Sequence, residues 1–454
     1  MKRPKVEAFA RNLSPETTAS VRSASVQKTK ARKEILWDDL KDVEAARTEA
    51  ARIKDDVLDR LKPLLLQFET AATALGVQVH WCVDGESARA KILEICRQTE
   101  PQGGVVVKAK SMATEEIHLN DYLEEHGFTP VETDLGEFVV QVDHDTPSHI
   151  VTPIIHKNRR QIAASFARED LGPYSEVPEE LAMQARLHLR QKFESAKIGI
   201  SGVNFAIAET GRIVLVENEG NNRLSTTAVE THIAVMGIEK LLARESDLPL
   251  FLRLLAGSAT GQRLTSYTHF IAGPRRSDEE DGPREVHVIL LDNGRTRVLA
   301  GKYREILRCI RCGACLNVCP VYRQASGHAY GHVYSGPLGA VLAPALEGIE
   351  KLGELAKASS LCGACEEVCP VKIPIPRMLL ELRDEATQAG VIKEVIPWKA
   401  FAAGATQPAG WRMGLKLLPM AKFAPGGPAK QGWTESRELP EIEGRNFRKW
   451  WNSR

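Results

Sequence analysis

Apolar side chains between residues 35 and 75 recur at spacings of three and four, which is typical of amphipathic helices. The repeat begins at Ile35 and continues past Leu65, so helix is predicted over residues 35–75, with a kink or break at Pro63. Residues 1–33 lack this repeat and are rich in Arg, Lys and Ser, which predicts a flexible basic arm. The paired charges of residues 35–75 are typical of a solvated helix face and carry no evident chemistry.

Between residues 76 and 300 the pattern changes to short apolar runs separated by amphipathic helices. This alternation indicates an α/β domain with a largely parallel sheet. The apolar runs predict strands at 77–83, 105–107, 138–142, 198–200, 204–208, 213–216 and 286–291. Helices are predicted at 114–126, 179–193 and 226–242. Cys82 and Cys96 lie in this domain without metal-ligand spacing and are expected to be buried apolar residues.

Beyond this domain the chain is expected to be helical and then irregular. Helices are predicted at 302–308 and 375–389, on either side of a cysteine-rich stretch. From residue 397 onward the chain is rich in Pro, Gly and Trp, which predicts an irregular tail that lies over a partner or over the body of the protein. Its tryptophans are more typical of packing anchors than of nucleic-acid stackers, because no basic-aromatic stripe accompanies them.

The cysteine-rich stretch carries the strongest chemical signal. Seven of the nine cysteines lie in two blocks, and each block ends in Cys-Pro. The first block has the C-x2-C-x2-C-x3-C-P spacing of iron–sulfur proteins, in which the fourth thiolate crosses to a neighbouring cluster. Four cysteines also hold structural zinc, but zinc motifs rarely combine these gaps with a following proline. The blocks contain Cys309, Cys312, Cys315 and Cys319, then Cys362, Cys365 and Cys369.

Aligning the second block on the first by their shared Cys-Gly-Ala-Cys-x-x-Val-Cys-Pro places Ser359 opposite Cys309. Crossed ligation then gives one complete set of four thiolates, suited to a [4Fe–4S] cluster, and one set of three. The second set predicts either a [3Fe–4S] cluster or a [4Fe–4S] cluster whose fourth iron takes Ser359, water, substrate or a partner's group. The complete set is Cys309, Cys312, Cys315 and Cys369, and the deficient set is Cys319, Cys362 and Cys365. The cysteine spacing leaves these alternatives for the second cluster open.

Charge and hydropathy limit the classes of partner. The chain has 60 basic and 59 acidic residues, so its net charge of +1 gives no argument for nucleic acid or an anionic membrane surface. No uninterrupted apolar run approaches the ~18 residues needed to span a bilayer. Because the cysteines are concentrated in two blocks, they do not resemble a secreted disulfide framework. We therefore expect a cytoplasmic protein that is not integral to a membrane and binds no nucleic acid.

Polar residues at predicted strand ends supply further candidates in the α/β domain. Lys110 follows a strand and precedes a helix, where an anion can dock; the equal alternative is that Ser111 or Thr114 only caps this helix. Glu209, Glu219 and Arg223 lie in Gly- and Asn-rich segments, which are also ordinary turns. His328 and His332, between the cysteine blocks, either modulate a cluster or relay a proton, or are simply packed or solvated. No G-x-G-x-x-G follows a strand, so neither a flavin nor a nicotinamide fingerprint is present.

Several segments together resemble the LutB-type iron–sulfur subunit of bacterial lactate-utilisation systems. They are the two cysteine blocks, with their Cys-Pro-Val-Tyr and Cys-Pro-Val-Lys-Ile endings, and the Asn-Phe-Ala-Ile-Ala-Glu-Thr-Gly, Asn-Glu-Gly-Asn and Phe-Arg-Lys-Trp-Trp segments. The resemblance begins near residue 70 and excludes the basic arm. It implies a LUD α/β domain of the sugar-isomerase and CoA-transferase-like kind (70–300), followed by an all-α ferredoxin-type domain with two clusters (301–390), most simply two [4Fe–4S] clusters. The arm and helical segment (1–69) precede these domains, and the tail (391–454) follows them.

The same resemblance implies an electron-transfer role. It suggests an oxidoreductase component of a cytoplasmic complex with two companion subunits, which oxidises L-lactate to pyruvate and passes electrons to an acceptor chain. A second hypothesis makes the α/β domain the catalyst, with Lys110 or Arg223 on the lactate carboxylate and Glu209 or Glu219 as base. A third hypothesis is a non-catalytic iron–sulfur scaffold.

Overall fold

The computed structural model describes residues 6–392, 398–417 and 447–454. The chain divides into two units, Met1–Ala389 and Gly390–Arg454. In the second unit most of the described residues form helices, so the prediction of an irregular tail is wrong for these helical residues; residues 393–397 and 418–446 lie outside the description. These helices are α20 (Trp398–Ala405), α21 (Pro408–Leu417) and α23 (Phe447–Trp451).

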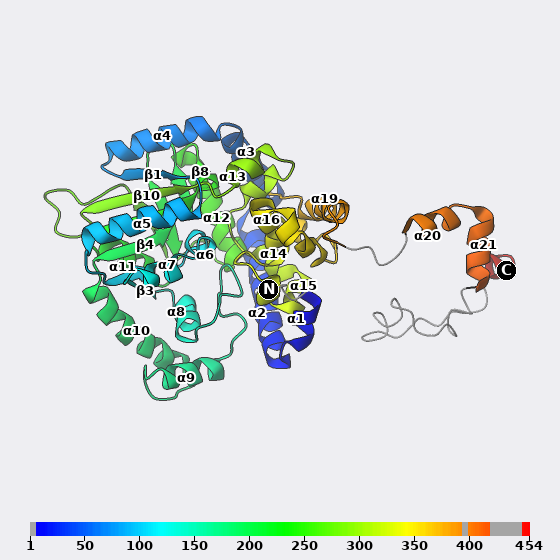
Figure 1. Cartoon of the computed structure of the whole chain (residues 1–454), viewed down its shortest axis with the longest axis horizontal. Helices are drawn as coiled ribbons and strands as arrows, with labels where there is room; N and C mark the ends of the chain where they lie inside the picture. The colour runs from blue at the N-terminus through cyan, green and yellow to red at the C-terminus, as the bar shows by residue number, and fades with distance from the viewer. Residues whose placement is uncertain (1–5, 393–397, 418–446) are drawn as a thin grey trace. The chain divides into compact units, whose positions relative to one another are not determined.

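A six-stranded, all-parallel sheet organises the first unit, in the order β1-β10-β7-β4-β2-β3. Alternate residues of its strands enter two separate cores, as in an α/β sheet covered on both faces. In β10, Val288 faces the core beneath α4, whereas Ile289 faces the core beneath α5; Figure 1 shows these two helices beside the sheet. The strands are β1 (Gln78–Cys82), β2 (Val105–Lys108), β3 (Thr129–Glu132), β4 (Ile198–Gly202), β7 (Thr231–Gly237) and β10 (Glu285–Leu291).

A smaller sheet of four strands, in the order β8-β5-β6-β9, adjoins the main sheet. Phe205 of β5 packs against Phe251 of α12, with ring centroids 5.6 Å apart. The predicted strands at 204–208 and 213–216 are therefore confirmed, but they belong to this second sheet. Its strands are β5 (Phe205–Ile207), β6 (Ile213–Glu217), β8 (Leu241–Leu242) and β9 (Tyr267–Ile271).

Helices connect and cover these strands. The helix predicted at 179–193 is confirmed as α10. The connecting helices are α5 (Gly85–Thr99), α6 (Met112–Glu116), α7 (Leu119–Glu125), α8 (Leu135–Val142), α9 (Arg159–Arg168), α10 (Pro178–Ser195), α11 (Asn221–Thr227), η1 (Ile238–Lys240), η2 (Glu245–Asp247), α12 (Leu248–Ala259) and α13 (Arg295–Ala300).

Three predictions in this region are wrong. Residues 138–142 belong to helix α8, because the Asp134 side chain accepts hydrogen bonds from the backbone N–H groups of Gly136 and Glu137 and starts a helix. The helix predicted at 226–242 contains β7, whose seven residues are all buried and therefore show no helical alternation. The helix predicted at 114–126 is split into α6 and α7, because His118 has a positive φ of 50°.

The N-terminal region consists of four helices: α1 (Val6–Asn12), α2 (Pro15–Asp39), α3 (Val43–Asp59) and α4 (Leu61–Ala74). The predicted flexible arm is therefore wrong for the described residues, since α2 packs against α12, α14 and α15 and buries Val21 completely. Arg32 of α2 also donates a 2.6 Å hydrogen bond to the carbonyl of Val368. The predicted break falls at Arg60, which leaves Pro63 in the first turn of α4, where proline is tolerated.

The cysteine-rich region is helical, as predicted. The helix expected at 375–389 is confirmed as α19, whereas residues 302–308 form a short 3₁₀ helix, η3, in place of the expected α-helix. The elements are η3 (Arg304–Arg308), α14 (Ala314–Val318), α15 (Pro320–Ala325), η4 (His328–Tyr330), α16 (Gly336–Glu347), α17 (Ile349–Leu352), η5 (Gly353–Lys357), α18 (Ala364–Glu367) and α19 (Ile375–Gln388).

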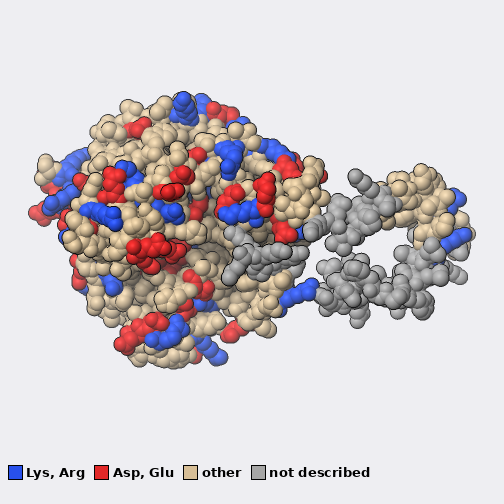
Figure 2. Space-filling model, in the orientation of Figure 1, with Lys and Arg blue, Asp and Glu red and all other residues tan. Residues whose placement is uncertain are grey.

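One continuous core joins the cysteine-rich region to the α/β region. Phe251 and Ile155 belong to the same buried cluster as Tyr322 and Leu342. Figure 2 shows Lys and Arg interspersed with Asp and Glu over the visible face of this unit. No helix within the described part of the chain is long and apolar enough to cross a bilayer.

A substitution at Gly327 tests how much the stability of the protein depends on the close contact between these two regions. A Cβ at this position would lie 1.8 Å from the carbonyl oxygen of Ser148, which also accepts a 2.7 Å hydrogen bond from Tyr322. We expect Gly327→Ala to destabilise the protein by about 1–3 kcal/mol through overpacking. The midpoint of urea unfolding of anaerobically purified protein measures this loss. Gly301→Ala is the control, because its Cβ would meet nothing nearer than 3.4 Å; equal midpoints for the two variants would contradict the prediction.

Candidate functional site

The seven thiols of the cysteine blocks lie in two neighbouring groups. Burial raises the pKa of Cys315 well above its usual value, and the charges of Cys312, Cys309 and Cys369 raise it further. Burial likewise raises the pKa of Cys365 to about 12, with contributions from Cys319 and Cys362. Buried thiols this close together repel one another as thiolates unless a cation is bound between them, so the donor set suits iron–sulfur clusters.

Backbone N–H groups also point at the sulfur atoms. Arg311 donates from its backbone to Cys309 Sγ at 3.4 Å, and Ile373 donates to Cys369 Sγ at 3.3 Å. Hydrogen bonds of this kind stabilise thiolates and tune the potential of a bound cluster. The local conformation that aims them depends on positive φ angles, 63° at Arg311 and 72° at Gly313.

A cavity of about 460 Å³ lies between the carboxyl edge of the main sheet and the first cysteine block. Gly202 ends β4 and Gly237 ends β7, and both line the cavity, as do Arg311 and Tyr334 from the cysteine-rich region. Ligands of open α/β sheets bind at this edge. The cavity therefore brings the usual ligand position of the α/β domain next to Arg311 of the first cysteine block.

Ionisable groups around this cavity titrate near neutrality. Burial raises the pKa of Glu137 to about 7, although Lys110 Nζ lies 3.2 Å from its carboxylate and opposes the shift. Burial also raises the pKa of Glu219 to about 7, and it lowers that of Lys240 to about 8. Groups with such pKa values can exchange protons at physiological pH, as general acids and bases do.

The four candidate residues of the α/β domain fall into two groups, those that line the cavity and those that do not. Lys110 and Glu219 both line the cavity, whereas Glu209 and Arg223 are not among its lining residues. Glu209 accepts a 2.9 Å hydrogen bond from the backbone of Glu245, and the backbone N–H of Arg223 donates to Glu217 at 3.0 Å. The Arg223 side chain is exposed.

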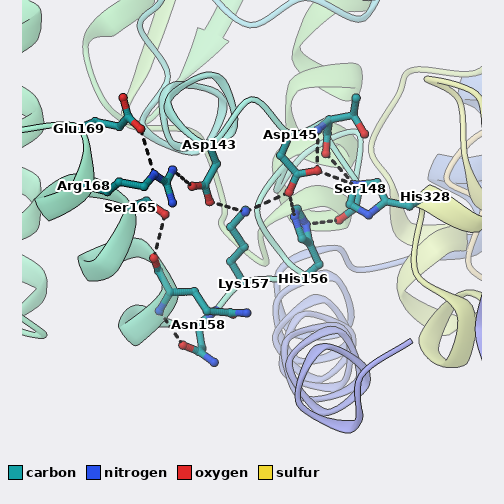
Figure 3. A network of polar contacts seen from close by, with 12 residues as sticks. Asp143, Asp145, Ser148, His156, Lys157, Asn158, Ser165, Arg168, Glu169 and His328 are labelled. Carbon is teal, nitrogen blue, oxygen red and sulfur yellow. Dashed lines mark hydrogen bonds and ion pairs between the residues drawn. The ribbon is translucent and has the colours of Figure 1, made fainter. Parts of the chain in front are cut away.

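The two spacer histidines hold neighbouring segments together. His332 Nε2 lies 2.6 Å from a carboxylate oxygen of Glu347, and His328 Nε2 donates to the carbonyl of Thr146 at 2.7 Å. Figure 3 shows His328 beside Asp145 and His156, which come from the loop that follows α8.

Asp145, His156 and His328 bring ligand atoms within 4.8 Å of one another. The Asp145 carboxylate, however, already lies 2.9 Å from both His156 Nε2 and the Lys157 ammonium, and Ser148 Oγ lies 2.7 Å from His156 Nδ1. Because hydrogen bonds and a fixed cation satisfy these groups, we describe them as a clasp between the loop and the cysteine-rich region.

A buried ion network, which the sequence analysis did not anticipate, links the sheet to the first cysteine block. Glu239 follows β7 and binds Arg295 at 2.6 Å and Arg311 at 3.1 Å. Arg295 also binds Glu116 at 2.8 Å, and Tyr334 donates to the same carboxylate at 2.6 Å. These residues are far apart in the sequence, so no local spacing indicates that they meet.

His149 is a second contact that the sequence analysis missed. Its buried ring lies against the first block, since a Cβ on Gly313 would be 2.9 Å from the ring. Its Nδ1 accepts hydrogen bonds from the backbone N–H groups of Val151 and Thr152, which leaves the proton on Nε2. His149 and Val151 thus cover the first block from the α/β side.

A parallel α/β domain joined to a helical region with two iron–sulfur cysteine blocks defines a ferredoxin-type electron-transport protein. Residues 65–291 match the LUD domain, residues 305–373 the 4Fe-4S dicluster domain, and residues 377–454 the C-terminal domain of lactate utilisation protein B. The chain belongs to the lactate utilization protein B family.

Full-length relatives support this assignment. Lactate utilization protein B of Bacillus velezensis is 43% identical over 445 residues, covering 95% of this chain and 93% of the relative. That of Bacillus subtilis is 41% identical over 460 residues, covering 99% and 96%. The uncharacterized electron transport protein YkgF of Escherichia coli is 43% identical over 435 residues, covering 93% and 91%. The resemblance therefore includes the N-terminal helices, contrary to the expectation that it begins near residue 70.

Glu239 tests the ion network. Burial would raise its pKa, but Arg295 and Arg311 lower it to about 2 from 4.5. Its ionised form therefore contributes stability that is fully present above about pH 4.5 and is lost as the pH falls toward 2. We expect Glu239→Gln to cost about 3–5 kcal/mol at pH 7, because it leaves two buried guanidinium groups without this partner. Urea unfolding between pH 7 and pH 3 measures the cost, which should shrink at the acid end.

Glu49→Gln is the matched control for this experiment. Glu49 pairs with Arg52 on the surface of α3, where an ion pair contributes about 0–1 kcal/mol. Equal losses for Glu239→Gln and Glu49→Gln, or a cost of Glu239→Gln that grows with acid, would contradict the network's stabilising role.

Proposed function

We propose that this protein is the iron–sulfur electron-transfer subunit of a cytoplasmic complex that oxidises L-lactate to pyruvate. The observation that carries the proposal is the pair of adjacent thiol groups, set against a cavity at the ligand-binding edge of a LUD domain. The names of the relatives refer to lactate utilisation and to electron transport. We further propose two companion subunits and an electron acceptor chain as its partners.

The proximity of the thiols supports two ligand sets with crossed connectivity. We assign Cys309, Cys312, Cys315 and Cys369 to the first cluster, because the charges of Cys309 and Cys369 raise the pKa of both Cys312 and Cys315. We assign Cys319, Cys362 and Cys365 to the second, since Cys365 is influenced by the other two. The last cysteine of each block thus binds the cluster of the other block, which keeps the two clusters close.

The two sites differ in exposure, which suggests an order of electron transfer. Cys312 is buried near the cavity-lining residues of the first block, whereas Cys362 is exposed. Bound clusters supply one-electron carriers, so two of them accommodate the two electrons released when one lactate becomes pyruvate. Electrons therefore enter at the first site and leave through the second, toward a partner.

The residues of the cavity favour a second candidate function, in which the LUD domain itself binds and oxidises the 2-hydroxy acid. Lys110 would hold the carboxylate, and Glu219, with a pKa of about 7, would accept the hydroxyl proton. The Cα hydrogen would also leave as a proton, so two protons would pass to solvent through Glu219 while the two electrons pass one to each cluster, because the sequence carries no flavin or nicotinamide fingerprint. Arg223 and Glu209 are weaker candidates, since neither lines the cavity.

Cys312→Ser tests the electron-transfer role. In the reconstituted complex, we expect it to abolish nearly all lactate-dependent reduction of the acceptor, because the first cluster loses one of its four thiolates. Cys82→Ala is the control, since Cys82 is buried in the α/β core away from the blocks. Undiminished electron flow in Cys312→Ser would refute the proposal, and clusters that are electrochemically silent in the native protein would favour a scaffold.

Calorimetric titration of lactate and pyruvate into the anaerobic holoprotein tests the second candidate. We expect Lys110→Met to weaken binding about 10- to 100-fold, as is typical when a charge-assisted hydrogen bond is lost. Arg223→Gln, which removes a cation outside the cavity, should bind as tightly as the native protein. Absence of binding to the native holoprotein would exclude this candidate while leaving the electron-transfer role intact.

A further inference from the structure

The two cysteine blocks fold into the same loop. Arg311 and Leu361 occupy equivalent positions and have φ angles of 63° and 55°, although neither is glycine. The glycines two residues later also match, with φ of 72° at Gly313 and 85° at Gly363, and a short helix begins directly after each. Positive φ is uncommon outside glycine, so two such residues at equivalent positions indicate one shared loop conformation.

Within this shared loop, Ser359 occupies the position of a cluster ligand. The Sγ of Cys309 accepts a hydrogen bond from the backbone N–H two residues later, that of Arg311, at 3.4 Å. The Oγ of Ser359 accepts the equivalent bond from Leu361 at 3.1 Å. The side-chain oxygen therefore has the same local geometry and the same donor as the thiolate that we assign to the first cluster.

The neighbouring serine is engaged elsewhere. The Ser360 side chain and the backbone N–H of Ala364 are both hydrogen-bonded to Cys362. Ser360 thus supports a thiolate in the second group, whereas Ser359 has the ligand position. The two adjacent serines differ in role despite their identical chemistry.

We propose that Ser359 Oγ is the fourth protein ligand of the second cluster and holds it as a four-iron cluster. The inference rests on the ligand set of Cys319, Cys362 and Cys365 assigned above. An iron–oxygen bond forms as the hydroxyl proton leaves to solvent, which is accessible because Ser359 is half-buried and Cys362 exposed. No electron is exchanged in this step.

The surroundings of the second block allow this exchange of ligand and proton. A Cβ on Gly363 would meet no atom within 4 Å, whereas one on Gly313 would meet His149 at 2.9 Å and Val151 at 3.3 Å. The first block is therefore covered by the α/β region at Gly313, and the second is open at the equivalent Gly363. An open site also admits water, so the experiment must distinguish a serine ligand from a water ligand.

Three variants of the full-length protein, purified anaerobically, provide the test: Ser359→Ala, Ser359→Cys and the control Ser277→Ala, which changes an exposed serine outside the cysteine blocks. Iron and sulfide analysis, EPR and Mössbauer spectroscopy are the measurements. We expect about eight irons per chain in the native protein and in Ser277→Ala. Ser359→Ala should fall to about seven irons and show a [3Fe–4S] EPR signal, and Ser359→Cys should keep about eight with an altered Mössbauer signature for one iron.

Two results would overturn the proposal. One is about seven irons in the native protein, which means that the second site holds three irons despite Ser359. The other is a Ser359→Ala variant with about eight irons and unchanged spectra, which means that water or nothing occupies the fourth position. Both readouts are independent of lactate, so failure of the lactate role in the Cys312→Ser experiment leaves this outcome unaffected.

Discussion

The bridge from Glu239 to Arg311 determines where the cysteine-rich region lies on the α/β domain. Glu239 is fully enclosed, and a buried carboxylate is unfavourable unless cations pair with it closely. Arg295 supplies one cation from α13, and Arg311 supplies the other from between two cysteines. Gly237 leaves the space that this arrangement needs, since a Cβ there would lie 2.2 Å from Glu239. One carboxylate thereby fixes the first cysteine loop against the end of β7.

Because of this bridge, residues of both regions line the cavity. The sheet contributes its carboxyl edge, with Lys110 and Glu219, and the cysteine-rich region contributes Arg311 and Tyr334. The Arg311 guanidinium stacks over the Tyr334 ring, 4.6 Å from its centroid, and both residues line the cavity. Arg311 stands between Cys309 and Cys312 in the sequence, so this wall belongs to the first cysteine block. The two regions also share one hydrophobic core, so neither is expected to keep this geometry alone.

Local patterns of apolar and polar residues predict much of the fold. They fail where an element is buried on both faces, because the alternation is then lost. Helix α10 carries an apolar residue every four positions, and strand β1 alternates apolar and polar residues. The sequence predicts both elements. Strand β7 is buried on both faces and carries no alternation, so it was mistaken for helix. The basic composition of α2 suggested a flexible arm, yet its Arg32 binds a backbone carbonyl beside the second block. Side-chain spacing cannot reveal such a long-range partner.

The cysteine ligands were evident from spacing alone, because the geometry of a cluster restricts which neighbours in sequence can bind it. Glu239, Arg295 and His149 had no such signature, since their partners lie in other elements. Ser359 is intermediate between these cases: alignment within the chain selected its position, and the loop conformation supplied the physical reason. An oxygen ligand at the exposed site is also chemically reasonable. An accessible thiolate is readily oxidised, whereas a serine hydroxyl at the same place is not.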